Sequence, residues 1–234
     1  MDKKNIENLL KLSKDSYDKI AADFDVTRKK EIWPEIRIFA EQVKSGDNIL
    51  DAGCGNGRLL EALQNKSINY VGIDSSLELL ALAQKNYPTH KFIEAELTKL
   101  PIVNVEQFSK EKFNYIFCLA VLQHVPGEEL RVQVLKNMHD FLAPGGKMII
   151  SNWNIWSSRH RNLVIKQMLY KILGKNEMDF GDIIFPWKNK YGKEVSERYY
   201  HAFNKRELCS ISKKAGWKNI SIQKDKYNYW LILS

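Results

Sequence analysis

Three glycines that alternate with other residues directly after an acidic residue form the chemically most informative segment of this chain. It reads Asp51-Ala52-Gly53-Cys54-Gly55-Asn56-Gly57, preceded by the apolar pair Ile49 and Leu50. Glycine lets the backbone approach a ligand where a Cβ atom would clash, and the free amides that open the next helix attract anionic groups. We predict a strand, a nucleotide-binding loop and a helix over residues 58–63; the alternative is a tight turn without a ligand.

A second acidic residue follows at a distance that suits ribose binding. Residues 68–73 are predicted to form another strand, and Asp74 stands 17 positions beyond Gly57. A carboxylate at this place can accept both ribose hydroxyls of a nucleotide. Dinucleotide-binding enzymes share this acid, but they require G-x-G-x-x-G, whereas the glycines here are spaced G-x-G-x-G.

The elements that must position these residues alternate along the chain. Residues 33–43 predict a helix with Pro34 in its first turn, and Ser75-Ser76-Leu77-Glu78 predicts a capping box with the Ser75 hydroxyl as the cap. Further strands are predicted at 91–94, 115–119 and 147–152, and a hairpin at 220–223 and 229–233. Such alternation is typical of an α/β fold whose ligands bind at the carboxyl ends of a mostly parallel sheet.

The loop and the two strands that follow it resemble class I S-adenosylmethionine-dependent methyltransferases. This resemblance implies a seven-stranded Rossmann-like sheet with helices on both faces, and S-adenosylmethionine as cofactor. It places Asp51 near the methionine amino group, Asp74 on the ribose, Glu96 at the adenine amino group and the Leu97 backbone at the ring. The implied cofactor-binding residues are Tyr17, Asp51, Gly53, Gly55, Gly57, Asp74, Ser75, Glu96, Leu97, Leu119 and Ala120.

Segments spread over the whole chain resemble one narrower family, the tRNA wobble-uridine carboxymethyl methyltransferases. The similar segments are 17–24, 27–28, 33–34, 120–125, 129–131, 142–146, 181–187, 197–203 and 228–230. The resemblance implies that the chain esterifies a carboxymethyl group on uridine C5 of a tRNA. Members from eukaryotes work with a small zinc-binding activator subunit, which is therefore a candidate partner.

The expected chemistry needs orientation more than proton transfer. A carboxylate with a pKa near ~4 is ionised at neutral pH, so its oxygen can attack a sulfonium methyl without a strong base. Arginine can hold a carboxylate with two parallel hydrogen bonds. Arg28 and Arg198 lie in family-like segments and are our catalytic candidates, together with His124, which the resemblance places near the methyl group.

Four residues of the back segments are candidates for substrate binding. Asp182, Trp187, Tyr200 and His201 lie in the two segments that resemble the family most specifically. Aromatic rings there could stack an extruded base while Lys188, Lys190 and Lys193 meet phosphates. The alternatives are an ion pair of Asp182 with Arg198, aromatic packing at the sheet edge, and His124 as a helix cap.

Length and composition are those of one soluble domain. The 234 residues carry a net charge of +8, and the positive excess lies wholly beyond residue 152, which suits a polyanion or a solvated lysine-rich face. We expect a helical cap at 1–47, a cofactor-binding core at 48–152, a substrate-side insertion at 153–203, and a helix and hairpin at 204–234. No targeting or membrane-spanning run is apparent, so we expect a cytoplasmic protein.

Cysteine spacing and function class complete the expectations. Cys54, Cys118 and Cys209 include no C-x-x-C pair, so we expect neither a disulfide framework nor a metal site.

Two other functions remain open beside the tRNA methyltransferase. One is a methyltransferase for small carboxylic acids, and the other is a non-catalytic tRNA-binding protein that retains the cofactor pocket.

Overall fold

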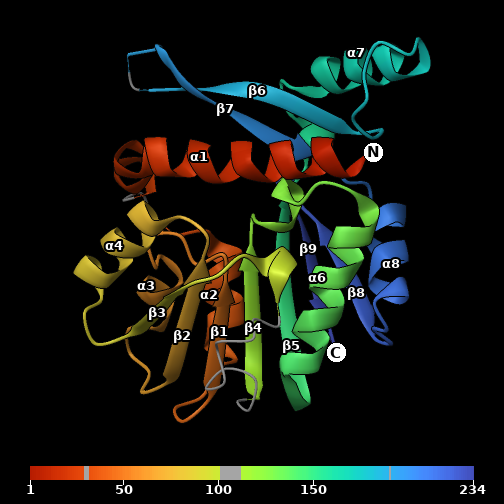
Figure 1. The fold of residues 1–234 in the computed structure, drawn as a ribbon. Helices are drawn as coiled ribbons and strands as arrows, with labels where there is room; N and C mark the ends of the chain where they lie inside the picture. Colours follow the sequence, from red (N-terminus) through yellow and green to blue (C-terminus); the bar gives the residue numbers. More distant parts are fainter. Residues whose placement is uncertain (29–31, 101–111, 190) are drawn as a thin grey trace.

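A seven-stranded sheet forms the centre of the computed structural model, which describes residues 1–28, 32–100, 112–189 and 191–234 (Figure 1). The strand order is β3-β2-β1-β4-β5-β9-β8, with β1 to β5 parallel and β9 antiparallel to both its neighbours. The strands are β1 (Asn48–Ala52), β2 (Asn69–Asp74), β3 (Lys91–Glu94), β4 (Phe113–Leu119), β5 (Leu142–Trp153), β8 (Ile220–Lys224) and β9 (Asn228–Leu233). The predicted α/β fold with a terminal hairpin is confirmed.

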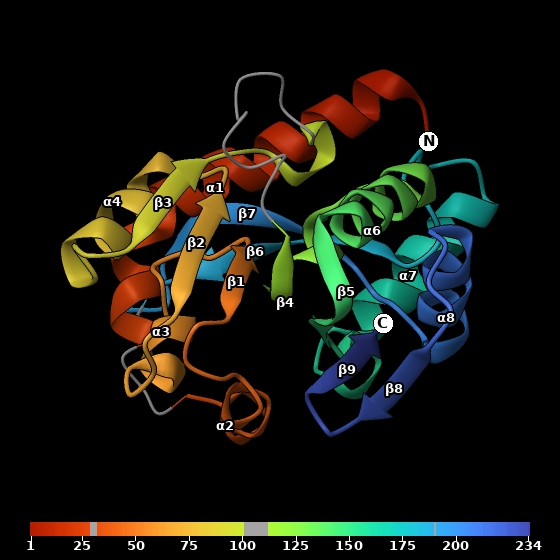
Figure 2. The ribbon, with the colours of Figure 1, turned by 90° about the horizontal axis from the view of Figure 1, so that it is seen from below.

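Helices cover both faces of this sheet (Figure 2). On one face α2 (Pro34–Glu41) and α3 (Leu59–Leu63) pack on apolar side chains of the strands. On the other face α6 (Glu128–Phe141) and α8 (Lys205–Lys214) do the same. The buried faces of β1 and β4, with Ile49, Leu50 and Ile116 at 0% exposure, explain why these short strands are mostly apolar.

Side-chain caps begin α8 and α4, and the cap of α4 differs by one residue from the sequence prediction. Asn204 caps α8, because its side chain accepts a hydrogen bond from the Glu207 amide. The cap of α4 (Leu77–Asn86) is Ser76, whose hydroxyl accepts from the Leu79 amide, so the prediction of Ser75 was wrong by one position. The Asp74 carboxylate accepts from the Ser76 amide, which holds Ser76 in the extended conformation of a cap.

A long helix and a separate hairpin lie over the carboxyl ends of the strands. Helix α1 (Lys3–Arg28) crosses the top of the sheet, and the hairpin of β6 (Asp182–Lys188) and β7 (Glu194–His201) lies above it (Figure 1). The expected insertion contains α7 (Arg161–Ile172), which ends shortly before Gly174, and two strands that were not anticipated. Short 3-10 turns complete the connections at η1 (Leu97–Lys99), η2 (Leu122–His124) and η3 (Ile155–Ser157).

Three side chains on one face of α1 fasten it to the sheet. Lys14 contacts Glu94 at 3.0 Å, Tyr17 bonds the His124 ring at 2.9 Å, and Asp18 accepts from the Ser76 hydroxyl at 2.6 Å. Their i, i+3, i+4 spacing places them on the same side of the helix. Within the described part of the chain, no helix has the length and apolar character needed to cross a bilayer.

Candidate functional site

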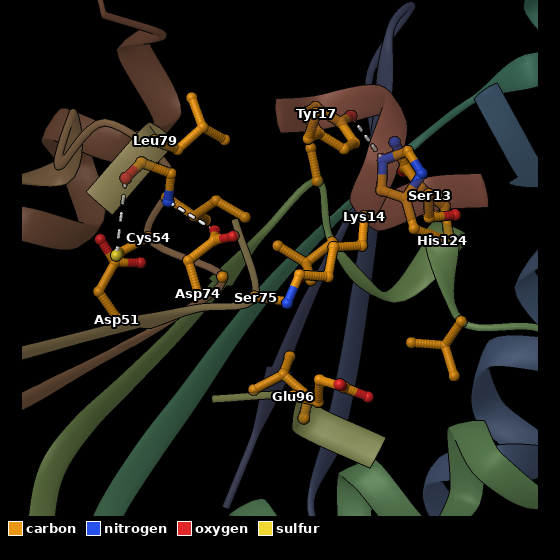
Figure 3. A pocket seen from close by; sticks show the side chains of 18 of the residues that line it. Ser13, Lys14, Tyr17, Asp51, Cys54, Asp74, Ser75, Leu79, Glu96 and His124 are labelled. Carbon is orange, nitrogen blue, oxygen red and sulfur yellow. Dashed lines mark hydrogen bonds between the residues drawn. The ribbon is translucent and has the colours of Figure 1, made fainter. Parts of the chain in front are cut away.

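A cavity of about 450 Å³ lies between α1 and the carboxyl ends of the strands. Its walls include the glycine loop, the end of β2, the start of η1 and the end of β4. All but one of the expected cofactor-binding residues line it, namely Tyr17, Asp51, Gly53, Gly55, Asp74, Ser75, Glu96, Leu97, Leu119 and Ala120. Figure 3 shows Asp51 and Asp74 on one side of this cavity and the bonded pair of Tyr17 and His124 on the other.

The glycine loop needs its glycines for space as well as for conformation. Gly53 has a φ of +83°, and a Cβ atom there would lie 2.4 Å from Cγ2 of Val121. Gly57, the expected residue that does not line the cavity, has a φ of +79°, and its Cβ atom would lie 2.9 Å from the Tyr87 ring. Gly57 therefore shapes the turn, whereas Gly53 and Gly55 form the cavity wall.

Asp51 is a buried carboxyl at the edge of the cavity. It is 3% exposed, and its Oδ2 accepts a hydrogen bond of 2.8 Å from the Tyr70 hydroxyl. Burial raises the pKa of Asp51 from 3.8 to about 7, while the bond from Tyr70 acts in the opposite direction. A cationic group that enters the cavity would stabilise the ionised form of this carboxyl.

Asp74 links the glycine loop to α4. Its two carboxylate oxygens accept from the amides of Gly55 and Ser76 at 2.8 and 2.9 Å. Burial raises the pKa of Asp74, and these backbone bonds counteract the rise. Each carboxylate oxygen has a second lone pair, so hydroxyls of a ligand can still bind.

The cavity continues along η1 and the end of β4. Glu96 precedes η1 and pairs with Lys99 at 2.9 Å, and the buried Leu97 begins the turn. Ala120 has a φ of +57° and is, among the residues described, the non-glycine with positive φ. Ser151 accepts its amide hydrogen at 2.9 Å, and this strained bend turns the chain from β4 towards His124.

These features suit the cofactor that the sequence resemblance implies. The loop packs so closely that a Cβ at Gly53 would clash, Asp51 could pair with an amino group, and Asp74 could accept ribose hydroxyls. Glu96 and Leu97 lie where an adenine would be expected. The described residues thus fit S-adenosylmethionine.

His124 lies at the far end of the cavity with both ring nitrogens engaged. Nδ1 is 2.9 Å from the Tyr199 carbonyl oxygen, and Nε2 is 2.9 Å from the Tyr17 hydroxyl. A carbonyl can only accept, so Nδ1 carries the hydrogen, and Nε2 of the neutral ring accepts from Tyr17. Burial lowers the pKa of His124 to about 4, and the charge of Arg198 contributes to this. His124 is therefore a neutral acceptor at physiological pH.

Arg198 is a buried guanidinium in an aromatic enclosure. It is 6% exposed, and its Cζ lies 4.5 Å from the Trp187 ring centroid, 5.1 Å from Phe185 and 5.2 Å from Tyr200. It donates to the Tyr200 hydroxyl at 2.9 Å, while its Nε has no hydrogen-bond partner among the described residues. Tyr200 in turn lies with its ring centroid 4.3 Å from His124 and lines the cavity.

The structure brings Trp187 to this group but not Asp182 or His201. Trp187 is half-buried and also contacts Phe24 of α1. Asp182 and His201 are 0% and 2% exposed, do not line the cavity, and bond to each other at 2.6 Å. The described ion partners of Asp182 are Arg131 at 3.6 Å and His201, so the ion pair with Arg198 considered from the sequence does not form.

Arg28 is the last residue of α1, and its side chain lies outside the part of the chain that the structure describes. Lys188 pairs with Glu194, Lys193 is exposed, and Lys190 lies outside the described residues.

Several residues at the cavity were not among the site residues predicted from the sequence. Lys14, Phe24, Gln123 and Trp153 line it, and Arg131 bonds to the loop that carries His124. Lys14 lies one helical turn before Tyr17, and Phe24, Gln123 and Arg131 lie within the family-like segments, so each of these had a cue. Trp153 depends on contacts between distant segments.

Comparisons with known proteins agree with this geometry. A family model described as methyltransferase domain matches residues 24–222. A tRNA (carboxymethyluridine(34)-5-O)-methyltransferase of Schizosaccharomyces pombe is 26% identical, with 92% of each chain covered. Other relatives of that name are longer proteins, of which this chain spans 31% to 54%.

Two further comparisons concern a second kind of methyltransferase and the fold. A ubiquinone biosynthesis O-methyltransferase of Pseudomonas aeruginosa is 28% identical over 65% of this chain and 67% of its own length. Among solved structures, an S-adenosylmethionine-dependent methyltransferase of Methanosarcina mazei superposes with a TM-score of 0.65. It is 20% identical, and the match covers 87% of this chain and 98% of that protein, which supports the fold.

Proposed function

This chain belongs to the methyltransferase domain family, and we propose that it esterifies the carboxymethyl group of a wobble uridine in tRNA. The chain is an enzyme that depends on S-adenosylmethionine, which supplies a methyl group bound to a sulfonium. In our proposal Asp51, Asp74, Glu96 and the glycine loop hold this cofactor. The acceptor then lies at the end of the cavity formed by His124 and Tyr200.

The observation that carries the proposal is that the buried guanidinium of Arg198 has no carboxylate partner among the described residues. A guanidinium that is 6% exposed normally has a carboxylate partner, yet none lies within 4.0 Å of Arg198 among the described residues. The neighbouring aromatic rings leave its Nε without an acceptor. An anionic acceptor would supply the missing charge, and the planar guanidinium matches a carboxylate.

His124 and Arg198 would act on different parts of the acceptor. The lone pair of Nε2 would repel a carboxylate oxygen, but once the acceptor displaces the Tyr17 hydroxyl from it, it can accept from an N–H group such as the uracil imide. Arg198 would hold the carboxylate, which needs no base because it is already ionised. Arg28 and the positive excess beyond residue 152 would meet phosphates of the tRNA.

A second function is favoured by His124 itself. A neutral imidazole whose Nε2 lone pair is released from the Tyr17 hydroxyl is suited to remove the proton of an acceptor hydroxyl, as methylation of a phenolic oxygen requires. The similarity to a ubiquinone biosynthesis O-methyltransferase supports this alternative. This alternative does not explain why Arg198 lacks a carboxylate partner, unless the hydroxylated acceptor also carries an acid group.

Methyl transfer from labelled cofactor tests both functions. The acceptors are total tRNA, tRNA treated with mild base to hydrolyse existing methyl esters, small carboxylic acids, and phenols. We expect transfer mainly to base-treated tRNA, with the label released as methanol on a second base treatment. Label that resists base, or transfer only to small molecules, would contradict the tRNA ester. Activity of the isolated chain would also mean that it needs no activator subunit.

Arg198→Gln tests the residue on which the proposal depends. We expect turnover to fall by about 10²-fold or more, because the acceptor carboxylate loses its charged partner. The affinity for S-adenosylmethionine should stay within about twofold, since Arg198 does not line the cofactor cavity. Arg206→Gln, an exposed substitution on α8, is the matched control. Unchanged turnover in the Arg198 variant would refute its role.

A further inference from the structure

A buried ionic cluster adjoins the hydrogen bond between His124 and Tyr199. It consists of Arg131 on α6, Asp182 on β6, His201 on β7 and Glu207 on α8, and all except Glu207 are at most 2% exposed. His201 lies 2.6 Å from a carboxylate oxygen of both Asp182 and Glu207. Burying several charges far from the solvent is expensive, so such a cluster calls for a reason beyond stability.

Arg131 contacts both sides of that hydrogen bond. Its Nε donates to the carbonyl of Val125, the residue after His124, at 2.9 Å. Its NH2 group donates to the Tyr199 hydroxyl at 3.2 Å, and that hydroxyl donates to Asp182 at 2.8 Å. The carbonyl of the same Tyr199 accepts from Nδ1 of His124. The contacts therefore close a ring through Arg131, Val125, His124 and Tyr199.

We propose that Arg131 is a positioning residue, which fixes the orientation and the protonated nitrogen of His124 by holding Val125 and Tyr199 at a set separation. Which nitrogen of a histidine carries the hydrogen is decided by the partner of the other nitrogen. Here the Tyr199 carbonyl selects Nδ1–H and leaves Nε2 as the acceptor. Asp182 assists by anchoring the Tyr199 hydroxyl, which gives this residue a role distinct from substrate contact.

The geometry of arginine suits this task. The three guanidinium nitrogens of Arg131 bond to three different elements. Nε bonds to the loop after η2, NH1 bonds to Glu207 of α8 at 3.4 Å, and NH2 bonds to the β6–β7 hairpin. A lysine offers one nitrogen on a flexible stem and cannot span these partners. The proposed role of His124 as an acceptor near the transferred methyl group is the basis of this inference.

Nitrogen NMR of histidine-labelled full-length protein, with and without S-adenosylhomocysteine, tests the inference without any turnover. The chain has five histidines, and the His124 signals are identified by their loss in His124→Gln. We expect a protonated Nδ1 and an unprotonated Nε2 at pH 7. A wild-type spectrum with the hydrogen on Nε2 would overturn the proposal, even if no variant folds.

Tyr199→Phe then tests the ring of contacts, because it removes only the hydroxyl and keeps the pair of Arg131 and Asp182. We expect a second set of His124 nitrogen signals and a fall in kcat of about five- to tenfold, with cofactor affinity unchanged. Arg131→Lys should have the same effect more strongly. Tyr115→Phe, which loses a hydroxyl contact with the Gln42 carbonyl far from His124, is the matched control.

Unchanged His124 signals and unchanged kcat in Tyr199→Phe would refute the positioning role. The spectra also separate this inference from the proposed function. If tRNA is not the acceptor, the NMR result still stands or falls on its own. If tRNA is methylated but the His124 nitrogen signals are the same in the wild type and in Tyr199→Phe, only the inference about Arg131 fails.

Discussion

The affinity for S-adenosylmethionine should rise with pH through neutrality because of Asp51. In our proposal the cofactor's ammonium group pairs with the ionised carboxyl, so a protonated Asp51 must first lose its proton. With a pKa of about 7, roughly 3% of Asp51 is ionised at pH 5.5 and roughly three quarters at pH 7.5. The dissociation constant should therefore fall about 25-fold between these two values.

Isothermal titration calorimetry measures both parts of this prediction. Titrations in two buffers with different ionisation heats give the dissociation constant and the number of protons released. Binding should release close to one proton at pH 5.5 and about a quarter of a proton at pH 7.5. Asp51→Asn should bind weakly and independently of pH over this range.

Tyr70→Phe provides a directional control for the same reasoning. The Tyr70 hydroxyl lowers the pKa of Asp51 through its hydrogen bond, so its removal should shift the affinity curve to higher pH. A wild-type dissociation constant that stays constant between pH 5.5 and 7.5, with no proton release, would refute the pairing of Asp51 with the ammonium group.

Two further predictions concern the loop and His124. Gly53→Ala should abolish measurable cofactor binding, because its Cβ would lie 2.4 Å from Val121, whereas Gly46→Ala, with a similar φ of +91° but nothing within 4 Å, should bind normally in the same titration. His124 has a pKa of about 4 when folded and 6.5 when unfolded, so unfolding takes up a proton and stability falls as pH drops through this window. Urea unfolding should find the wild type up to about 2 kcal/mol less stable at pH 5 than at pH 7.5, relative to the same difference in His124→Gln; an equal pH response in both proteins would contradict a neutral buried ring.

The cofactor half could be predicted from the sequence because its signals are local. The acid at position 51, the glycines after it and Asp74 at the next strand end are all encoded within a few residues of the turns that they form. The apolar runs around Leu50 and Ile116 reveal buried parallel strands for the same reason. Even the one-residue error at Ser75 arose locally, from two adjacent serines competing for one cap position.

The acceptor half depends on pairings that no short segment encodes. The partner of Asp182 could not be read from the sequence, because Arg131 lies on another helix and Arg198 was an equally reasonable candidate. The β6–β7 hairpin escaped prediction since β7 lacks a regular alternation of buried and exposed residues. Tyr17 was expected only at the cofactor, and its bond to His124 became visible only in three dimensions.

The attachment of α1 has a consequence for the kinetics of this enzyme. Lys14, Tyr17 and Asp18 hold the helix over the cavity through single exposed or half-buried contacts, each worth about 1 kcal/mol or less. We expect cofactor and product to exchange when these contacts open, whereas the acceptor should bind at His124 with α1 in place. We therefore expect a compulsory order of addition, in which S-adenosylmethionine binds before the acceptor and S-adenosylhomocysteine leaves after the methylated product. Product-inhibition patterns would reveal this order, and random addition would mean that α1 does not control access.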